Sequence, residues 1–419
     1  DTGGTSASRA PHPPRVGRVS TRWNTVATAA GLTDPEGTIR PTIFAEMSAL
    51  AAATGAVNLG QGFPDSDGPA WIREAAITAI REGANQYPPG RGIASLRQAI
   101  AAHQFRHYGL TWDPESQVLV TAGATEALTA AVLALAGPGD EVLTLEPFYD
   151  SHAAAIALAG ATHTTAPLVA AADGFRLDIA ALERAVTPQT RLILINTPHN
   201  PTGTVLTSDE LSAIAAVAVR VDALVVTDEV YEHLTYDGVR HVPFAMLPGM
   251  AERTITISSA GKTFSLTGWK IGWATGPAHL VEALLTVKQF LTYSGGAPFQ
   301  PAIARALNDG SPDIDELSTS LQCRRDLLVT GLREAGFAAG IPQGTYFVCA
   351  DAAHLLTPDL PDGAALARAL PHLLGVVAIP VSAFCHTGSA TATALSSWLR
   401  FTFVKDEETI RRALLRLSS

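Results

Sequence analysis

The feature that most constrains the fold of this chain is a series of short apolar runs separated by segments with helical periodicity. Each run is rich in Val, Ile and Leu and is followed by small or polar residues. Apolar strands that alternate with helices are typical of a parallel sheet buried on both faces. The sequence therefore predicts an α/β fold with a mostly parallel sheet, whose strands we expect at residues 117–121, 141–145, 192–196, 223–228, 254–258 and 271–275.

The length of the chain favours more than one domain. With 419 residues, of which 47% are hydrophobic, it exceeds the size at which a single core usually divides. From about residue 312 the pattern changes to an α+β texture. We expect four parts: an N-terminal extension or arm at 1–36, the first part of a small domain at 37–69, a large domain at 70–310, and the rest of the small domain at 311–419. We assign no chemical role to the first part.

Composition argues against several classes of protein. The net charge is −10 and no basic stripe is visible, which disfavours a nucleic-acid partner. No apolar run approaches the roughly 18 residues of a membrane span, and we find no secretory signal. The three cysteines, Cys323, Cys349 and Cys385, are far apart and lack the spacing of metal ligands. We therefore expect reduced thiols, no metal, no membrane association and a cytoplasmic location.

One lysine stands where its amine could react. Lys262 follows the β-branched run 254–257 in a turn of small residues, and a second lysine, Lys270, follows in the same segment. A lysine at a strand end can form an imine, and hydroxyl groups with a second cation suit a phosphate. These are the requirements of pyridoxal phosphate (PLP), which is held through its aldehyde and its phosphate. Taken alone, a turn lysine is usually a solvated residue, so the inference depends on the neighbouring motifs.

Three further motifs follow strands, at the edge where an α/β sheet holds ligands. The small-residue turn 122–127 opens a helix whose first N–H groups could bind a phosphate, although a plain tight turn looks the same. The aromatic residues of 146–150 could stack on a planar cofactor or pack on the core. In the turn 196–203, Asn200 could donate a hydrogen bond to a ring oxygen, whereas His199 is read as structural.

A fourth motif places an acid at a strand end. Asp228 closes the apolar run 223–228, where a carboxylate needs a partner. Beside a pyridine nitrogen, a carboxylate keeps that nitrogen protonated, and a protonated ring stabilises the carbanion formed when the Cα proton leaves. Tyr231 follows closely and could reach the ring hydroxyl. The alternative for Asp228 is a structural pair with a core arginine or a helix N-terminus.

With these motifs in this order, the chain resembles the class I/II aminotransferases, PLP enzymes of fold type I, from about residue 39 to its end. The resemblance implies a large domain with a mostly parallel seven-stranded sheet covered by helices, a smaller α+β domain, and a homodimer. It also implies transfer of an amino group from an amino acid to a 2-oxo acid, with 2-oxoglutarate or pyruvate as acceptor. The segments that carry it are 57–65, 85–87, 200–203, 259–265 and 400–405.

The resemblance implies a role for each matching residue. Lys262 resembles the lysine that holds PLP as a Schiff base and shuttles protons. Arg400 resembles the arginine that clamps the substrate α-carboxylate, which a guanidinium fork binds bidentately. Gly62 would lie in a loop that closes over the substrate, and Phe44 would line the substrate pocket. The remaining expected cofactor contacts are Tyr149 on the ring face, Asp228 at the ring nitrogen, Asn200 and Tyr231 at the ring oxygen, and Ala124, Thr125, Ser259, Lys270 and the neighbouring subunit's Tyr87 at the phosphate.

Within the family, the chain is most similar to the N-succinyldiaminopimelate aminotransferases and the kynurenine, glutamine and methionine aminotransferases. Phe44 stands where kynurenine-type enzymes carry a tryptophan, and segments 42–47 and 382–385 look more like the succinyldiaminopimelate group. We therefore expect an N-succinyl-LL-diaminopimelate aminotransferase, with a kynurenine/methionine/glutamine type as the alternative. Arg40 and Arg91 are candidates for binding the succinyl group, with ordinary solvated arginines as the plainer interpretation.

Three other functions are compatible with parts of this pattern. A cysteine-conjugate β-lyase would share the fold and cofactor but expel a thiol from Cβ, because fold and cofactor do not fix the reaction. A PLP-sensing regulator would need a DNA-binding domain, and 1–36 is too short to supply one. A structural homologue without activity is disfavoured because Lys262, Asp228, Tyr231 and Arg400 are all present.

Overall fold

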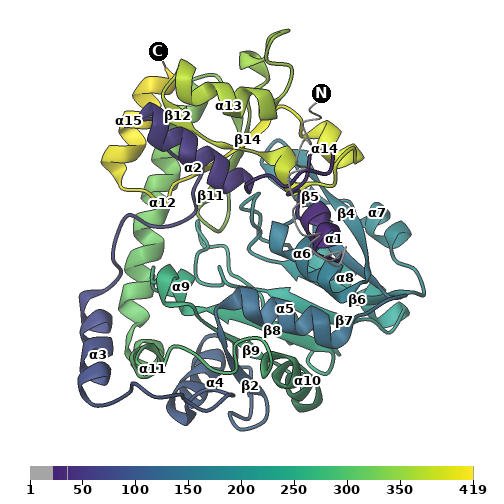
Figure 1. Cartoon of the computed structure of the whole chain (residues 1–419), viewed down its shortest axis with the longest axis vertical. Helices are drawn as coiled ribbons and strands as arrows, with labels where there is room; N and C mark the ends of the chain where they lie inside the picture. Colours follow the sequence, from purple (N-terminus) through teal and green to yellow (C-terminus); the bar gives the residue numbers. More distant parts are fainter. Residues whose placement is uncertain (1–21, 35, 419) are drawn as a thin grey trace, which may run out of the picture.

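The computed structural model describes residues 22–34 and 36–418, and a large twisted sheet forms its centre (Figure 1). In the described part of the chain this sheet has eight strands in the order β2-β9-β8-β7-β6-β3-β4-β5. Neighbours from β8 through β7, β6 and β3 to β4 pair in parallel, whereas β9 and β5 run antiparallel to their neighbours. The mostly parallel sheet is therefore confirmed, with strands β2 (Val118–Ala122), β3 (Glu141–Glu146), β4 (Thr162–Ala171), β5 (Gly174–Leu177), β6 (Thr190–Asn196), β7 (Leu224–Asp228), β8 (Thr254–Ser259) and β9 (Ile271–Thr275).

The eighth strand is one more than the seven that we expected. β5 pairs antiparallel with β4 at the edge of the sheet, through the tight connection between Ala171 and Gly174. Both strands are only partly buried, and the outer end of β4 is exposed. Because an edge strand is not covered on both faces, it carries no continuous apolar run to mark it in the sequence.

The central strands bury alternate residues in two different helix layers. Leu192 and Leu194 of β6 pack in the layer formed by α5, α6 and α10, whereas Ile193 and Ile195 pack in the layer formed by α7 and α8. Successive side chains of a strand point to opposite faces, so a strand covered on both sides must be apolar throughout. A third group of helices, α3, α4 and α11, packs on the end of the sheet that carries β2 and β9.

The helices have well-marked boundaries. Side chains of Thr42, Asp178, Thr207, Asp362 and Asp406 cap the first N–H groups of their helices, which explains where those helices begin. The helices are α1 (Arg22–Ala29), α2 (Ile43–Thr54), α3 (Ala70–Arg81), α4 (Ala94–Tyr108), α5 (Ala124–Leu135), α6 (Asp150–Ala159), α7 (Ile179–Ala185), α8 (Ser208–Arg220), α9 (Ala260–Thr263), α10 (Ala278–Lys288), α11 (Phe299–Asp309), α12 (Ser311–Glu334), α13 (Gly363–Leu373), α14 (Ala390–Ala394) and α15 (Glu407–Leu417).

A second, smaller sheet lies with α2, α13 and α15 at the top of Figure 1. Its order is β10-β11-β14-β13, and each pair is antiparallel. A separate two-stranded ladder pairs β1 from the N-terminal part of the chain with β12 from the C-terminal part. The strands are β1 (Val57–Asn58), β10 (Ala338–Ala339), β11 (Phe347–Asp351), β12 (Val376–Val377), β13 (Ile379–Pro380) and β14 (Trp398–Thr402).

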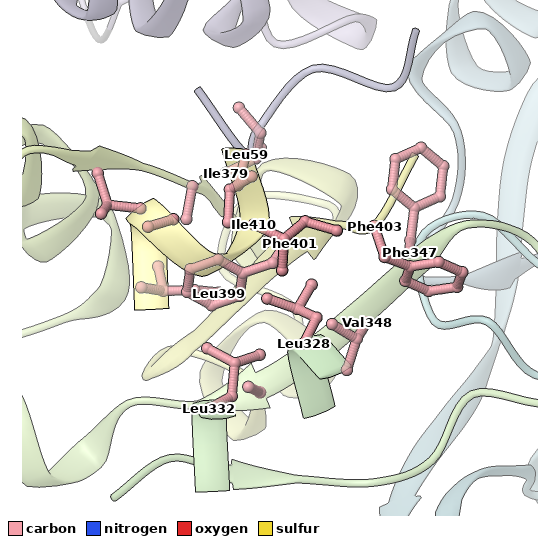
Figure 2. Close-up of a cluster of buried hydrophobic side chains, with 14 of the residues drawn as sticks. Leu59, Leu328, Leu332, Phe347, Val348, Ile379, Leu399, Phe401, Phe403 and Ile410 are labelled. Carbon is pink, nitrogen blue, oxygen red and sulfur yellow. The ribbon is translucent and has the colours of Figure 1, made fainter. Parts of the chain in front are cut away.

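The core of this smaller part draws on both ends of the chain. Figure 2 shows Leu59 and Ile379 beside Phe401, with Leu328 and Leu332 of α12 on the other side. All five side chains are fully buried. Residues near position 59 are therefore held in the same hydrophobic core as residues near position 400.

The long helix α12 connects the two parts of the molecule (Figure 1). Ile314 near its start packs in the core of α3, α4 and α11, whereas Leu328 and Leu332 pack in the core of the smaller sheet. At the other end of the chain, α1 packs against α6, and residues 1–21 of the expected N-terminal extension lie outside the described residues. Among the described helices, none combines the length and apolar character needed to cross a bilayer.

Candidate active site

A cavity of about 340 Å³ opens at the carboxyl ends of the parallel strands, facing the smaller sheet. β6, β7 and β8 end at this edge, and the register places Asn196 directly beside Asp228. Carboxyl ends of parallel strands therefore bring residues from distant parts of the chain together. Twelve of the predicted site residues line the cavity: Phe44, Gly62, Ala124, Thr125, Tyr149, Asn200, Asp228, Tyr231, Ser259, Lys262, Lys270 and Arg400.

Lys262 lies in the one-turn helix α9, immediately after β8, rather than in the open turn that we expected. Its Nζ atom donates a hydrogen bond to Oη of Tyr346 (2.6 Å), and Oη of Tyr346 donates to the carbonyl oxygen of Gly62 (2.6 Å). The amine is thus positioned by a phenol that belongs to the smaller part of the molecule. Sequence reasoning missed Tyr346, which looks like an ordinary aromatic residue before a strand.

Asp228 is the last residue of β7, and it lines the cavity. The imidazole Nε2 of His152 lies 3.7 Å from Oδ2, and among the described residues Oδ1 accepts one long hydrogen bond (3.4 Å), from the N–H of Val230. Within the described residues, Nε2 of His152 has no hydrogen-bond partner. The carboxylate is therefore free to hold a cation from the cavity side. His152 was also missed; its only signal was its position just after the aromatic motif.

Tyr231 and Asn200 face the same space. Tyr231 is buried with its ring edge-on to Tyr346, with 5.2 Å between ring centroids. Burial, with the nearby Tyr346, raises the pKa of the Tyr231 phenol well above its ordinary value, so the phenol keeps its proton and can donate it. The backbone N–H of Asn200 donates to Oδ1 of Asn196 (2.7 Å), which fixes the turn that carries the Asn200 side chain.

The N-terminus of α5 and Lys270 form a small cationic cradle. Gly123 caps α5 with a φ of 78°, and a Cβ atom at Gly123 would lie 3.2 Å from Nζ of Lys270. The free N–H groups at the start of a helix attract an anion, and a lysine amine adds a positive charge. Ala124, Thr125 and Ser259 line the same corner. The arrangement suits a phosphate group.

Arg400 on β14 is a buried cation that faces the cavity. Its side chain is 2% exposed, and Nη1 and Nη2 donate to Oδ1 of Asn200 and to the carbonyl oxygen of Gly60, both at 2.9 Å. The guanidinium lies over the ring of Phe347, 4.0 Å from its centroid. Burial lowers the pKa of Arg400 to about 10. Within residues 22–34 and 36–418 it forms no ion pair, and its Nε atom has no hydrogen-bond partner.

Aromatic rings line the cavity beside Arg400. The ring of Phe44 lies 5.4 Å from the Arg400 guanidinium, and the carbonyl oxygen of Phe44 accepts a hydrogen bond from Nε2 of Gln61 (3.1 Å). Gly62 packs so closely that a Cβ atom there would lie 2.5 Å from Cζ of Phe347. A side chain at position 62 would therefore displace the Phe347 ring from its place beneath Arg400.

Three predicted residues lie apart from the cavity. Tyr87 is 82% exposed and contacts Tyr293 edge-on, with 5.7 Å between ring centroids. Arg40 pairs with Asp34 (3.2 Å), and Arg91 pairs with Glu282 (2.6 Å). The structure therefore does not place either arginine where it could bind a substrate within this chain.

The fold and the site together define a class of protein, namely an α/β enzyme whose amine, carboxylate and guanidinium converge on one small-molecule cavity. The sequence model of the family "Aminotransferase class I and II" matches residues 54–417. The chain therefore belongs to the class I and II aminotransferase family, and it is an enzyme of the aminotransferase type. This result confirms the resemblance, the fold type and the enzyme class that the sequence predicted.

Individual relatives agree with this assignment. The chain is 56% identical over 381 residues to "Probable N-succinyldiaminopimelate aminotransferase DapC" of Mycobacterium tuberculosis. This alignment covers 90% of this chain and 95% of that protein. It is 38% identical over 395 residues to human "Kynurenine--oxoglutarate transaminase 3", covering 88% of this chain and 86% of that protein. The solved structure of the N-succinyldiaminopimelate aminotransferase from M. tuberculosis has a TM-score of 0.87, over 90% of this chain and 97% of that chain.

Proposed function

We propose that this aminotransferase uses pyridoxal 5'-phosphate as its cofactor and N-succinyl-LL-diaminopimelate as its amino donor, with 2-oxoglutarate or pyruvate as the acceptor. The observation that carries the proposal is the convergence of Lys262, Asp228 and Arg400 on one cavity. They supply a reactive amine, an anion for a cationic ring and a cation for a substrate carboxylate. The 56% identity to the M. tuberculosis protein of that name supports the choice of donor.

The residues of the cavity fit PLP. The cradle formed by Lys270 and the N-terminus of α5 suits its phosphate, and a side chain at Gly123 would fill that cradle. Asp228, which has only weak contacts, suits the ring nitrogen, and the protonated Tyr231 suits the ring oxygen. When bound, PLP supplies an electron sink that stabilises negative charge on the substrate Cα.

Residues of this chain would perform the other steps, which are substrate binding and proton transfer. The amine of Lys262 would hold the cofactor through its aldehyde and, once freed by the incoming amino acid, would accept the Cα proton at Nζ and donate it again. Tyr346 lies 2.6 Å from that atom and would orient it. Arg400, which lines the cavity and has no carboxylate partner among the described residues, would bind the α-carboxylate and so aim the Cα–H bond at Lys262.

The donor can be identified by absorbance of the purified holoenzyme in the absence of an acceptor. We expect N-succinyl-LL-diaminopimelate to convert the cofactor to its amine form with a kcat/KM at least about tenfold above kynurenine, methionine or glutamine, a difference of about 1.4 kcal/mol. A higher value for one of the other three would overturn the substrate and leave the aminotransferase intact. Pyruvate and ammonia released from a cysteine conjugate would instead reveal β-lyase chemistry.

We further infer a cytoplasmic homodimer in which Tyr87 reaches the phosphate of the neighbouring site. An exposed aromatic patch formed by Tyr87 and Tyr293 supports this proposal, because the two rings contact each other edge-on and are 82% and 42% exposed, and exposed apolar patches mark contact sites. The three cysteines form no disulfide, as in a reducing compartment.

Replacing Tyr87 with alanine is expected to weaken cofactor binding by about tenfold, which corresponds to the loss of one hydrogen bond to a charged group. Equilibrium dialysis of the cofactor measures this change. Leu415→Ala is the matched control, because Leu415 is 76% exposed on α15, outside both the patch and the cavity. If sedimentation experiments show an active monomer, Tyr87 does not act on the cofactor of a neighbouring subunit.

A further inference from the structure

Three histidines that do not line the cavity form a compact cluster in the larger part of the molecule. His103 and His107 lie one turn apart on α4, and His233 lies in the turn after β7. Their candidate ligand atoms all lie within 4.8 Å of one another. The three pairs of rings have centroid separations of 4.5, 4.9 and 4.8 Å, so the imidazoles form a triangle. The third histidine is 130 residues from the first, which is why no spacing in the sequence indicates the cluster.

Structural packing accounts for part of this cluster but not for all of it. Nε2 of His103 and Nε2 of His233 are 2.8 Å apart, so these two rings share a hydrogen bond. The ring of His107 is exposed and, among the described residues, makes no hydrogen bond, yet it is directed at the other two. An exposed third imidazole beside one buried and one half-buried ring gives an ion an entry path from solvent.

Burial dominates the electrostatics of the cluster. Burial lowers the pKa of His103 well below its ordinary value, lowers that of His107, and lowers that of His233 to about 3. The neutral imidazole is the form that binds metals. The carboxylates of Glu232 and Asp315 and the guanidinium of Arg106 all act on His107, so charges of both signs lie near the cluster.

We propose that His103, His107 and His233 form a binding site for a divalent transition-metal ion of the zinc type. Neutral imidazole nitrogens favour zinc, nickel and copper over magnesium and calcium, and two histidines one turn apart on a helix are a common part of zinc sites. At a Zn–N distance of about 2.0–2.1 Å, tetrahedral ligands are about 3.3 Å apart. The pair of atoms now at 2.8 Å would separate by about 0.5 Å, and the fourth position would remain open to water.

The ion would connect α4 to the wall of the active site. His233 belongs to the same turn as Tyr231, and Glu232 between them accepts a hydrogen bond from Oγ of Ser258. Ser258 immediately precedes Ser259, which lines the cavity. An ion bound only by the folded chain therefore stabilises the fold and fixes the turn that carries Tyr231.

The test is a titration of the metal-free holoenzyme with Co²⁺, whose visible d–d absorption reports the coordination geometry, followed by displacement with Zn²⁺. We expect one ion per chain with a tetrahedral-type spectrum, no response to Mg²⁺, and a rise in the thermal midpoint with Zn²⁺. His107→Ala changes an exposed side chain, so the fold should persist while affinity falls by at least about tenfold. His233→Ala should have the same effect on affinity.

Two control variants separate this site from other surface ligands. His279→Ala alters an exposed histidine on α10, and Cys323→Ser alters an exposed thiol. Both should bind Co²⁺ and Zn²⁺ with the affinity of the unmodified enzyme. Wild-type affinity in His107→Ala and His233→Ala, or the absence of saturable binding at one ion per chain, would overturn the proposal.

Discussion

Replacing Lys262 with alanine is expected to reduce the rate of transamination by at least about 10⁴-fold. General acid–base catalysis by a positioned side chain contributes about 10²–10⁴-fold, and this residue is also the proposed covalent anchor of the cofactor. The loss should appear in kcat/KM for the amino donor. The absorbance band of the lysine-bound cofactor should disappear in the same variant. Circular dichroism should be unchanged, because the side chain is only half-buried in the one-turn helix α9.

Two further variants distinguish the chemistry of this amine from its charge. Lys262→Arg keeps a cation beside Oη of Tyr346, but a guanidinium does not deprotonate near neutral pH and cannot act as the base. It should therefore be as inactive as the alanine variant. Lys270→Ala removes a cation from the same cavity and should keep the absorbance band while binding the cofactor more weakly. Turnover within tenfold of wild type in Lys262→Ala would refute the assignment.

The sequence predicts the large sheet well where its strands are buried on both faces. β6 and β7 read as continuous apolar runs because each lies between two helix layers. β4 and β5 could not be placed in the same way, because half-exposed edge strands need no such run. The sequence pattern also did not predict the one-turn helix at Lys262. Gly261 and Thr263 are poor helix formers, so this helix depends on its tertiary setting.

The site could be predicted in part for a similar reason. Asp228 and Ser259 stand at the ends of neighbouring parallel strands, so recognising the strands is enough to place them at one edge. Arg400 comes from the smaller sheet, and only the family resemblance connected it with them. Tyr346 was missed because its partner Lys262 is 84 residues away and nothing local distinguishes it from a core aromatic residue.

Replacing Arg400 with alanine is expected to lower kcat/KM by about a thousandfold, which corresponds to about 4 kcal/mol. The guanidinium is buried, and among the described residues it has no carboxylate partner. A desolvated cation is costly unless an anion compensates it, so a substrate carboxylate entering the cavity would make a strong charge-assisted contact. Arg400→Lys restores the charge without the planar fork and should recover only part of the activity.

A substrate without the α-carboxylate separates binding by Arg400 from its structural contacts. Nη1 and Nη2 already hold Asn200 and Gly60, so the alanine variant also loses those two hydrogen bonds. If Arg400 acts through the carboxylate, the decarboxylated amine should react slowly and at similar rates with the wild type and with Arg400→Ala. A thousandfold loss with that amine as well would show that Arg400 mainly holds the Asn200 turn in place. Because Arg400 lines the cavity and, among the described residues, has no carboxylate partner, we expect the first result.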